Sequence, residues 1–442
     1  MKLMTRLRAA SADPEDNLSW IDDFWSRAGA HIFAREEDGV LILPPNMVYR
    51  ANGTAAALVA YLRKGGRMAD VQFPSPEARR DTSLFFGDLA ALYRGDGPAN
   101  GTVSAVPYDF SFTKLPVLGE LAVTYRCNNA CRFCYAGCGG DAEAALRRPE
   151  LGTEEYKDII DIFADRARIP FFSFTGGEPT LRDDLEILVA HAKSRGLSTN
   201  LVTNGTLIDS RRAEALRRCG LGSAQVSLEA DSESLHDELT GRRGAYKECL
   251  AGISALLGAD IPTQTNTTLT RLNVERAPLL PSFIKSLGIA RFAMNLFIPT
   301  FPSAQADALF VSYEEIGPVV EAVAKEAKRQ GMVFYWYSPT PFCTFNPISK
   351  GMGNKSCAAA DGLLSVAPDG SVLPCSSWDE PLGNLRRDDF SALWFSEGAS
   401  FYKQKRFAPE ACGSCESFIP CQGACPLYWR FTHSTPRPRS CP

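Results

Sequence analysis

Histidine, charge of one sign and long apolar runs are all scarce in this 442-residue chain. Its four histidines are too few for a site built from several imidazoles. Forty-seven basic residues stand against fifty-one acidic ones, which argues against nucleic acid or an anionic membrane as the main partner. The longest charge-free run, 330–349, is broken by prolines and polar residues, so it does not qualify as a membrane helix of ~20 mainly apolar residues.

Cysteine is also well below the level of a disulfide scaffold. The fourteen cysteines make up about 3% of the residues, far below the ~8–10% of such proteins. Eight of them nevertheless follow residue 340. The first seventeen residues contain no apolar segment typical of a secretory signal, so we expect a cytoplasmic protein with reduced thiols. Clustered cysteines in that setting indicate metal or redox sites.

The chain divides into three regions by pattern, and the first is 1–110. It contains short alternating strands, a helix that begins after Asn52, a second helix over 75–93, and a linker rich in Gly and Pro. This composition predicts a small separate domain.

The second region, 111–335, alternates short apolar runs with amphipathic segments. The apolar runs are LAVTY, FFSFT, STNLVT, SAQVSL, IPTQTNTTL and RFAMNLF. This rhythm is typical of a parallel sheet covered by helices, and six strands predict an open α/β barrel rather than a full eight-unit barrel of ~250 residues. In the third region, 336–442, Pro, Gly, Cys and Ser dominate, so we expect bound metal to hold it together.

Three cysteines lie within eight residues directly after the first predicted barrel strand. Cys127, Cys131 and Cys134 follow the spacing C-x3-C-x2-C. Three thiolates can hold a 4Fe–4S cluster with one iron left open, whereas a zinc site would require a fourth ligand such as Cys138. The carboxyl end of a barrel strand is where α/β folds place ligands.

This motif resembles the signature of the radical S-adenosylmethionine (SAM) superfamily. The resemblance extends to Gly176, Gly177 and Glu178 in FFSFTGGEPT, a motif that in this family binds the amino group of SAM. Later strand ends match more loosely, and the resemblance implies further SAM contacts from Asn204, Ser227, Glu229, Arg242 and Asn266. The implied chemistry is reductive cleavage of SAM to a 5′-deoxyadenosyl radical that abstracts hydrogen from a substrate. It requires a flavodoxin- or ferredoxin-type electron donor.

The cysteines of the third region resemble the SPASM extension of radical SAM enzymes. The shared pattern is a cysteine pair spaced around Gly370, then C-x2-C-x5-C-x3-C and a last cysteine. The resemblance implies two auxiliary 4Fe–4S clusters, and thus three clusters in all. Its implied ligands are Cys357, Cys375 and Cys425 for the first cluster, with Cys343 as candidate fourth ligand, and Cys412, Cys415, Cys421 and Cys441 for the second. Without Cys343, the first cluster would keep an open iron.

Residues ~30–98 resemble the winged-helix peptide-recognition domain of peptide-modifying systems, similar to the pyrroloquinoline-quinone peptide chaperone. The segment GVLILPPNMVYRANGTAAALVAYLRKGG carries the likeness. We therefore expect a radical SAM/SPASM maturase whose amino-terminal domain binds a ribosomally made precursor peptide, with no nucleic acid or membrane partner. A structural cap on the barrel is the alternative for this domain.

Three other functions remain open. A tetrapyrrole side-chain decarboxylase shares the SPASM layout. A sulfatase maturase would carry an aspartate directly after Cys375, where this chain has Ser376. An iron–sulfur electron carrier would not need the complete C-x3-C-x2-C and GGEP motifs.

Overall fold

The computed structural model describes residues 18–43, 47–94, 96–103, 113–137, 149–300, 304–352 and 356–432. The chain forms two compact units, residues 1–107 and 108–442. Each unit has its own hydrophobic core. In the described part of the chain, no helix is long and apolar enough to cross a membrane.

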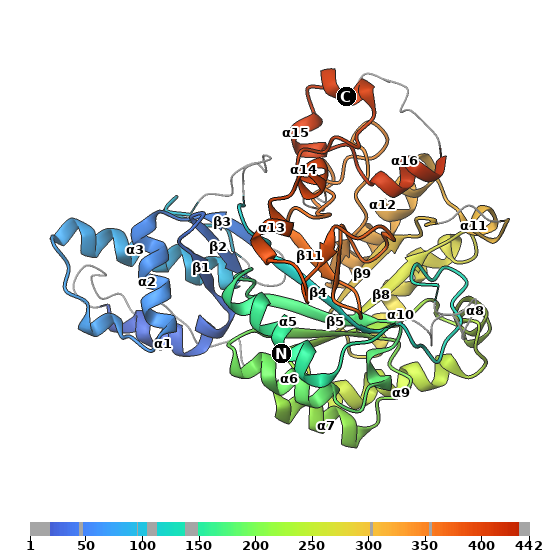
Figure 1. Ribbon diagram of the computed structural model, residues 1–442, viewed down its shortest axis with the longest axis horizontal. Helices are drawn as coiled ribbons and strands as arrows, with labels where there is room; N and C mark the ends of the chain where they lie inside the picture. The colour runs from blue at the N-terminus through green and yellow to red at the C-terminus, as the bar shows by residue number, and fades with distance from the viewer. Residues whose placement is uncertain are drawn as a thin grey trace. The chain divides into compact units, whose positions relative to one another are not determined.

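The first unit is a three-stranded antiparallel sheet with helices (Figure 1). The predicted helix after Asn52 is present, and the Asn52 side chain accepts a hydrogen bond of 2.8 Å from the Ala55 amide, as expected for an N-cap. The sheet order is β1-β2-β3, so β1 and β3 are its edges. The elements are α1 (Ser19–Ala28), β1 (Phe33–Arg35), β2 (Val40–Leu43), β3 (Met47–Arg50), α2 (Gly53–Arg63) and α3 (Pro76–Arg94).

The second unit is built on one ten-stranded sheet in the order β10-β9-β8-β7-β6-β5-β4-β11-β12-β13. All six predicted barrel strands are present and parallel. They are β4 (Leu118–Thr124), β5 (Phe171–Gly176), β6 (Ser198–Thr203), β7 (Ser223–Ser227), β8 (Thr263–Leu269) and β9 (Arg291–Leu296).

Two further strands extend the parallel sheet at its edges. β10 (Val333–Trp336) pairs with β9, and β11 (Leu363–Val366) pairs with β4. The segment SVAPDGSVLPC predicts a hairpin with Asp369-Gly370 at its turn. β11 does turn there into β12 (Ser371–Leu373), and β12 pairs with β13 (Gly383–Asn384). The third region of the chain therefore shares a sheet with the second.

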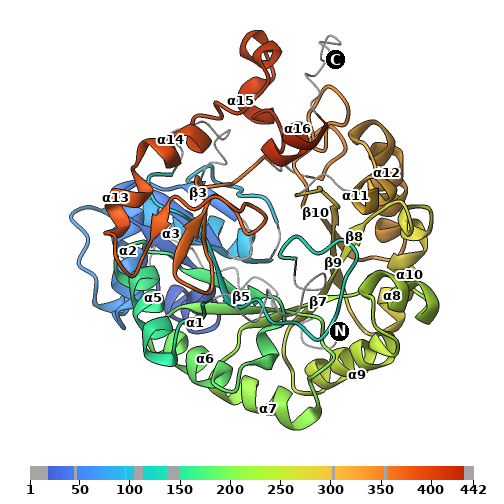
Figure 2. The same ribbon diagram turned by 45° about the vertical axis from the view of Figure 1, so that its right-hand side comes forward.

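Helices cover the outer face of this curved sheet (Figure 2). Apolar residues on alternate strand positions, such as Leu121, Phe172 and Val226, pack with helix residues in one large core. The covering helices are α5 (Thr153–Asp165), α6 (Leu185–Ser194), α7 (Ser210–Cys219), α8 (Glu233–Thr240), α9 (Ala245–Gly258), α10 (Leu280–Ser286), α11 (Ala304–Leu309) and α12 (Tyr313–Arg329). The last region adds α13 (Phe390–Trp394), α14 (Glu397–Lys403), α15 (Phe418–Cys421) and α16 (Pro426–Thr432).

Candidate functional site

The first cysteine motif lies at the carboxyl end of the parallel sheet. β4 ends at Thr124, and the loop that follows carries Cys127, Cys131 and Cys134, all half-buried. The main-chain amide of Ala130 donates to the carbonyl of Thr240 over 2.9 Å, which holds this loop against the end of α8. Cys138 lies outside the described residues.

Burial keeps the Cys127 and Cys131 thiols protonated in the absence of metal. It raises the pKa of Cys127 to about 11 and that of Cys131 well above its ordinary value, and nearby Glu178 and Glu229 add to the respective shifts. Coordination to iron displaces such a proton outright. Within the described ranges, no three acidic, His or Cys residues lie close enough to share one metal ion. The ligands of a 4Fe–4S cluster bind separate irons.

The two glycines at the end of β5, Gly176 and Gly177, allow two chain segments to touch. The Gly177 amide donates to the Thr124 carbonyl over 2.7 Å, and the Glu178 amide donates to the Arg126 carbonyl over 2.8 Å. A Cβ atom on Gly177 would overlap the Arg126 carbonyl, and Gly176 has a φ of 138°, which favours glycine. The GGEP motif therefore packs directly on the segment that leads into the cysteine loop.

Glu178 is fully buried and satisfied by the protein itself. Its carboxylate accepts hydrogen bonds from the Thr180 amide and hydroxyl, from the Thr203 hydroxyl (2.7 Å) and from the Asn204 amide (2.7 Å). Burial raises its pKa, and these donors oppose the shift. The carboxylate thereby joins the ends of β5 and β6. Its contact with the amino group of SAM stays a prediction.

Asn204 connects the end of β6 to the cysteine loop. Its side-chain amide donates to Asn128 over 2.8 Å, and its oxygen accepts from the amide and hydroxyl of Thr206. Asn128 in turn donates to the Thr206 hydroxyl over 2.8 Å. Sequence reasoning missed the part played by Asn128, although its position next to Cys127 was a signal.

Three further predicted SAM contacts lie near the end of β7: Ser227 ends this strand, Glu229 follows it, and Asn266 lies beside Ser227 within β8. Ser227 and Asn266 pair in register, and buried Glu229 accepts a 2.8 Å hydrogen bond from the Thr268 amide. Burial raises the pKa of Glu229 to about 8. The Asn266 amide donates to Asn295, but its buried oxygen has no hydrogen-bond partner among the described residues. Such an orphaned acceptor fits a ligand hydroxyl.

Arg242 reaches the cysteine loop from the segment between α8 and α9. Its guanidinium donates to the Asn129 side chain over 2.7 Å and forms an ion pair with Glu248. The hydrogen bond to Glu248 is the main cause of its raised pKa, and burial opposes the shift. The predicted pairing with the SAM carboxylate stays a prediction beside this ion pair.

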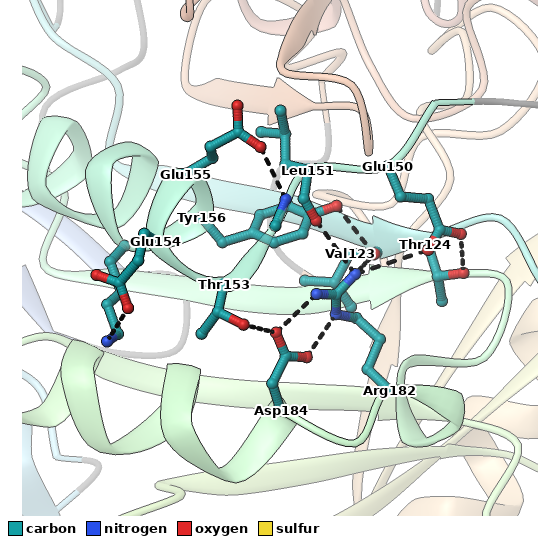
Figure 3. Close-up of polar contacts among 12 residues, drawn as sticks. Val123, Thr124, Glu150, Leu151, Thr153, Glu154, Glu155, Tyr156, Arg182 and Asp184 are labelled. Atoms are coloured by element: carbon teal, nitrogen blue, oxygen red, sulfur yellow. Dashed lines mark hydrogen bonds and ion pairs between the residues drawn. The ribbon is translucent and has the colours of Figure 1, made fainter.

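A charged network supports the end of β4 (Figure 3). Arg182 forms a two-pronged ion pair with Asp184, at 2.7 and 2.8 Å, and donates to the Val123 carbonyl over 3.2 Å. Glu150 accepts from the Thr124 hydroxyl and lies 3.6 Å from Arg182. Arg182 and Asp184 are close in sequence, but only the fold brings Arg182 to Val123 and Glu150, so no motif reveals the network.

One tyrosine ties this network to the third region of the chain. The Tyr156 hydroxyl lies 2.9 Å from the carbonyls of both Val123 and Pro368. Pro368 belongs to the turn of the β11–β12 hairpin. The Tyr156 side chain therefore contacts both the strand that leads into the Cys127 loop and the hairpin that precedes Cys375.

The structure brings together the three thiols predicted for the first auxiliary cluster. Cys375 packs against the buried cluster that includes Cys357, and both Cys357 and Cys425 lie close enough to contribute to the raised pKa of Cys375. Burial is the main cause of that shift, and it also raises the pKa of Cys425 to about 12.

Orphaned donors and a buried cation lie near the predicted ligands. Among the described residues, Trp378 and Gln422 carry buried side-chain nitrogens without a hydrogen-bond partner; Trp378 packs against the cluster that contains Cys357, and Gln422 follows Cys421. Lys405 donates to the Cys357 carbonyl over 2.7 Å and pairs with buried Asp361 over 2.8 Å. Iron–sulfur clusters take hydrogen bonds on their sulfurs, so donors left unpaired beside buried thiols fit such a group.

The second predicted ligand set lies on short helical turns near the end of the chain. The Cys415 amide donates to the Cys412 carbonyl over 3.1 Å, and Cys421 ends α15. The Phe342 amide donates to the Cys421 sulfur over 3.4 Å, so the segment that carries Cys343 passes this second set. The assignment of Cys343 to the first cluster stays a prediction. Cys441 lies outside the described residues.

Comparison with known proteins identifies the family. Residues 121–277 match the radical SAM superfamily and residues 357–416 match the SPASM iron–sulfur cluster-binding domain. An AdoMet-dependent heme synthase of Oleidesulfovibrio alaskensis is 30% identical over 68% of this chain and 80% of its own length. The chain belongs to the radical SAM superfamily and carries a SPASM domain, and it is a radical SAM enzyme.

The chain is also similar to two peptide-modifying or peptide-binding proteins. A PqqA peptide cyclase of Rhizobium meliloti is 28% identical over 68% of this chain and 80% of its own length. The crystal structure of Streptococcus suis SuiB bound to its precursor peptide SuiA has a TM-score of 0.65 at 17% identity, covering 90% of this chain and 95% of that one. At that identity the likeness concerns the fold. The family implies 4Fe–4S clusters and SAM, for which the residues described above are suited.

Proposed function

We propose that this enzyme is a radical SAM/SPASM maturase that removes a hydrogen atom from a ribosomally made precursor peptide and crosslinks or otherwise modifies it. The observation that carries the proposal is the separate amino-terminal unit with its own core and a three-stranded antiparallel sheet. The fold likeness to SuiB spans 90% of the chain, whereas the alignments with the heme synthase and the peptide cyclase span 68%.

The proposed sites follow from the residues already placed. Cys127, Cys131 and Cys134 hold the first cluster, and the ends of β5 to β8 bind SAM. When bound, these groups supply a 5′-deoxyadenosyl radical. The chain itself orients SAM through the GGEP turn and the Asn266 oxygen. Two auxiliary clusters, held by the third region, bring the proposed total to three.

The amino-terminal unit is the proposed site for the precursor peptide. Strands β1 and β3 pair on one side only among the described strands, and an extended peptide can add to such an edge through main-chain hydrogen bonds. A flavodoxin- or ferredoxin-type protein is the proposed electron donor.

A tetrapyrrole side-chain decarboxylase is the second candidate, because three AdoMet-dependent heme synthases are 28–30% identical to this chain. Deletion of residues 1–107 separates the two functions. The enzyme, reconstituted with iron and sulfide, is incubated anaerobically with dithionite, SAM and either short peptides encoded beside its gene or a carboxylate-bearing tetrapyrrole.

For a maturase, we expect the full chain to modify a peptide and the truncated chain to form 5′-deoxyadenosine while losing peptide modification. Mass spectrometry of the peptide and chromatography of the nucleoside measure both. Decarboxylation of the tetrapyrrole at equal rates by both chains, with no peptide modified, would establish the second candidate instead.

A further inference from the structure

The inner face of the barrel sheet is polar. Strand residues that face the helices are apolar or are buried threonines, whereas alternate residues on the opposite face include Ser173, Ser223, Gln225 and Gln264. These four side chains keep partial solvent exposure. A closed barrel of this type fills its interior with branched apolar side chains. Here the inner face of the sheet is instead lined by hydrogen-bonding groups.

One row of this inner face crosses five neighbouring strands. The strand register places these residues side by side: Ser365, Glu120, Ser173, Asn200 and Ser223. The Ser223 hydroxyl donates to Asn200 over 2.9 Å, and the Asn200 amide donates to Ser173 over 3.2 Å. The Ser365 hydroxyl donates to the Glu120 carboxylate over 3.4 Å.

Glu120 is the only carboxylic acid in the ten strands of the sheet. Its hydrogen-bond partners are the hydroxyls of Ser365 and Ser376, and no lysine or arginine within the described segments pairs with it. Burial raises its pKa, and the two hydroxyls oppose the shift. By contrast, Glu178 accepts four hydrogen bonds from the protein. A carboxylate offers about four acceptor sites, so Glu120 has capacity left for a donor from outside the protein.

Glu120 lies close to both predicted cluster regions. Its charge acts on Tyr135, the residue after Cys134, and on Cys375 of the first auxiliary set. The carboxylate therefore lies in the interior between the loop that binds the radical-type cluster and the hairpin that ends at Cys375. The radical would form at the carboxyl end of the sheet. A substrate that lay near Cys375 while this radical attacked it would contact Glu120.

We propose that Glu120 binds the substrate residue that is modified, by accepting a hydrogen bond from it, and that it selects neutral or cationic side chains there over carboxylates. The inference rests on the proposed function and names the class of peptide residue that the site takes. A carboxylate-bearing substrate would instead place like charges together in a poorly solvated interior, which is unfavourable.

The test combines Glu120 variants with a glutamate scan of the peptide. Mass spectrometry of the wild-type product first locates the modified residue. Each core residue of that peptide is then replaced in turn by Glu, and product formation is measured with the wild-type enzyme, E120Q and E120D. Exposed Glu154 on α5 provides the matched control E154Q, because its side chain is 82% exposed.

With the unaltered peptide, E120Q is expected to raise KM about tenfold, the effect of losing one hydrogen bond to a charged group. It also lowers the ratio of modified peptide to 5′-deoxyadenosine formed. E120D restores part of the ratio, and E154Q behaves as wild type. At the modified position or its immediate neighbour, Glu blocks the wild-type enzyme and is tolerated by E120Q.

Two results would overturn the inference. One is a KM for E120Q within twofold of wild type; the other is an identical pattern of Glu intolerance in both enzymes. Iron content and circular dichroism show whether E120Q is folded, and E120D carries the comparison if it is not. A wild-type enzyme that modifies no peptide contradicts the proposed function itself, and is thereby distinguished from a failure of Glu120 alone.

Discussion

Two buried glutamates, Glu178 after β5 and Glu229 after β7, differ in how the protein satisfies them. Glu178 accepts four hydrogen bonds and joins two strand ends. Glu229 accepts one hydrogen bond, from the Thr268 amide, among the contacts of the described residues. The same chemical group thus joins two strand ends at one position, and at the other it holds a proton up to a high pH.

The proton on Glu229 makes stability depend on pH. Its pKa rises from an ordinary 4.5 to about 8 on folding, so between those values the folded protein holds a proton that the unfolded chain has lost. The stabilising effect is complete below pH 4.5 and is lost as the pH rises towards 8. We expect the iron-free protein to lose up to ~1.4 kcal/mol of unfolding free energy per pH unit in this window.

Glu229→Gln should remove most of that loss and should stabilise the protein at pH 8. Urea unfolding at pH 6 and pH 8 measures the difference, with Glu154→Gln as a control that keeps the wild-type dependence. If the Glu229→Gln variant lost as much stability as wild type between these pH values, Glu229 would not carry the proton.

At the scale of elements, the segments that follow β4 and β5 lie in close contact because Gly177 has no side chain. Gly177→Ala should push the end of β5 away from Arg126, because a Cβ atom would overlap its carbonyl oxygen. We expect this variant to lose more than tenfold in SAM cleavage and to bind less iron at the first cysteine motif. The matched control is Gly258→Ala at the end of α9, where a Cβ meets nothing within 4 Å.

The control should gain up to ~1 kcal/mol of stability because Ala favours helix over Gly. Iron content and 5′-deoxyadenosine formation are measured for both variants. Normal activity in Gly177→Ala would show that the loops can separate without consequence.

The sequence predicted most of the elements but only some of their contacts. Periodicity identified six barrel strands, and the Asp369-Gly370 turn identified the β11–β12 hairpin, because both signals are local. The runs that form β10 and β11 are only four residues long, and nothing local shows that they join the barrel sheet. The Arg182 network and the row through Glu120 depend on residues from distant strands, which spacing along the chain does not reveal. A lone acid in the apolar run LGELAVT was the one available signal for Glu120.

At the scale of the whole molecule, the cysteines separate into sets that can be tested independently. Replacing Cys127, Cys131 and Cys134 together by Ala should abolish SAM cleavage and leave roughly eight of twelve irons, if all three clusters hold four each. Cys219→Ala is the control, since this half-buried residue at the end of α7 belongs to none of the proposed ligand sets. Colorimetric iron assay of the reconstituted proteins gives the count. Loss of clearly more than four irons would contradict the partition.

The shared sheet has a consequence for electron movement. β11, which leads into the hairpin before Cys375, is hydrogen-bonded to β4, which leads into Cys127, and Tyr156 bridges both. The path between the two thiol sets therefore runs through a hydrogen-bonded scaffold and not across a hinge. Electron tunnelling slows steeply with distance, so a scaffold that holds this gap constant would keep the transfer rate the same whichever residue of a substrate occupies the interior.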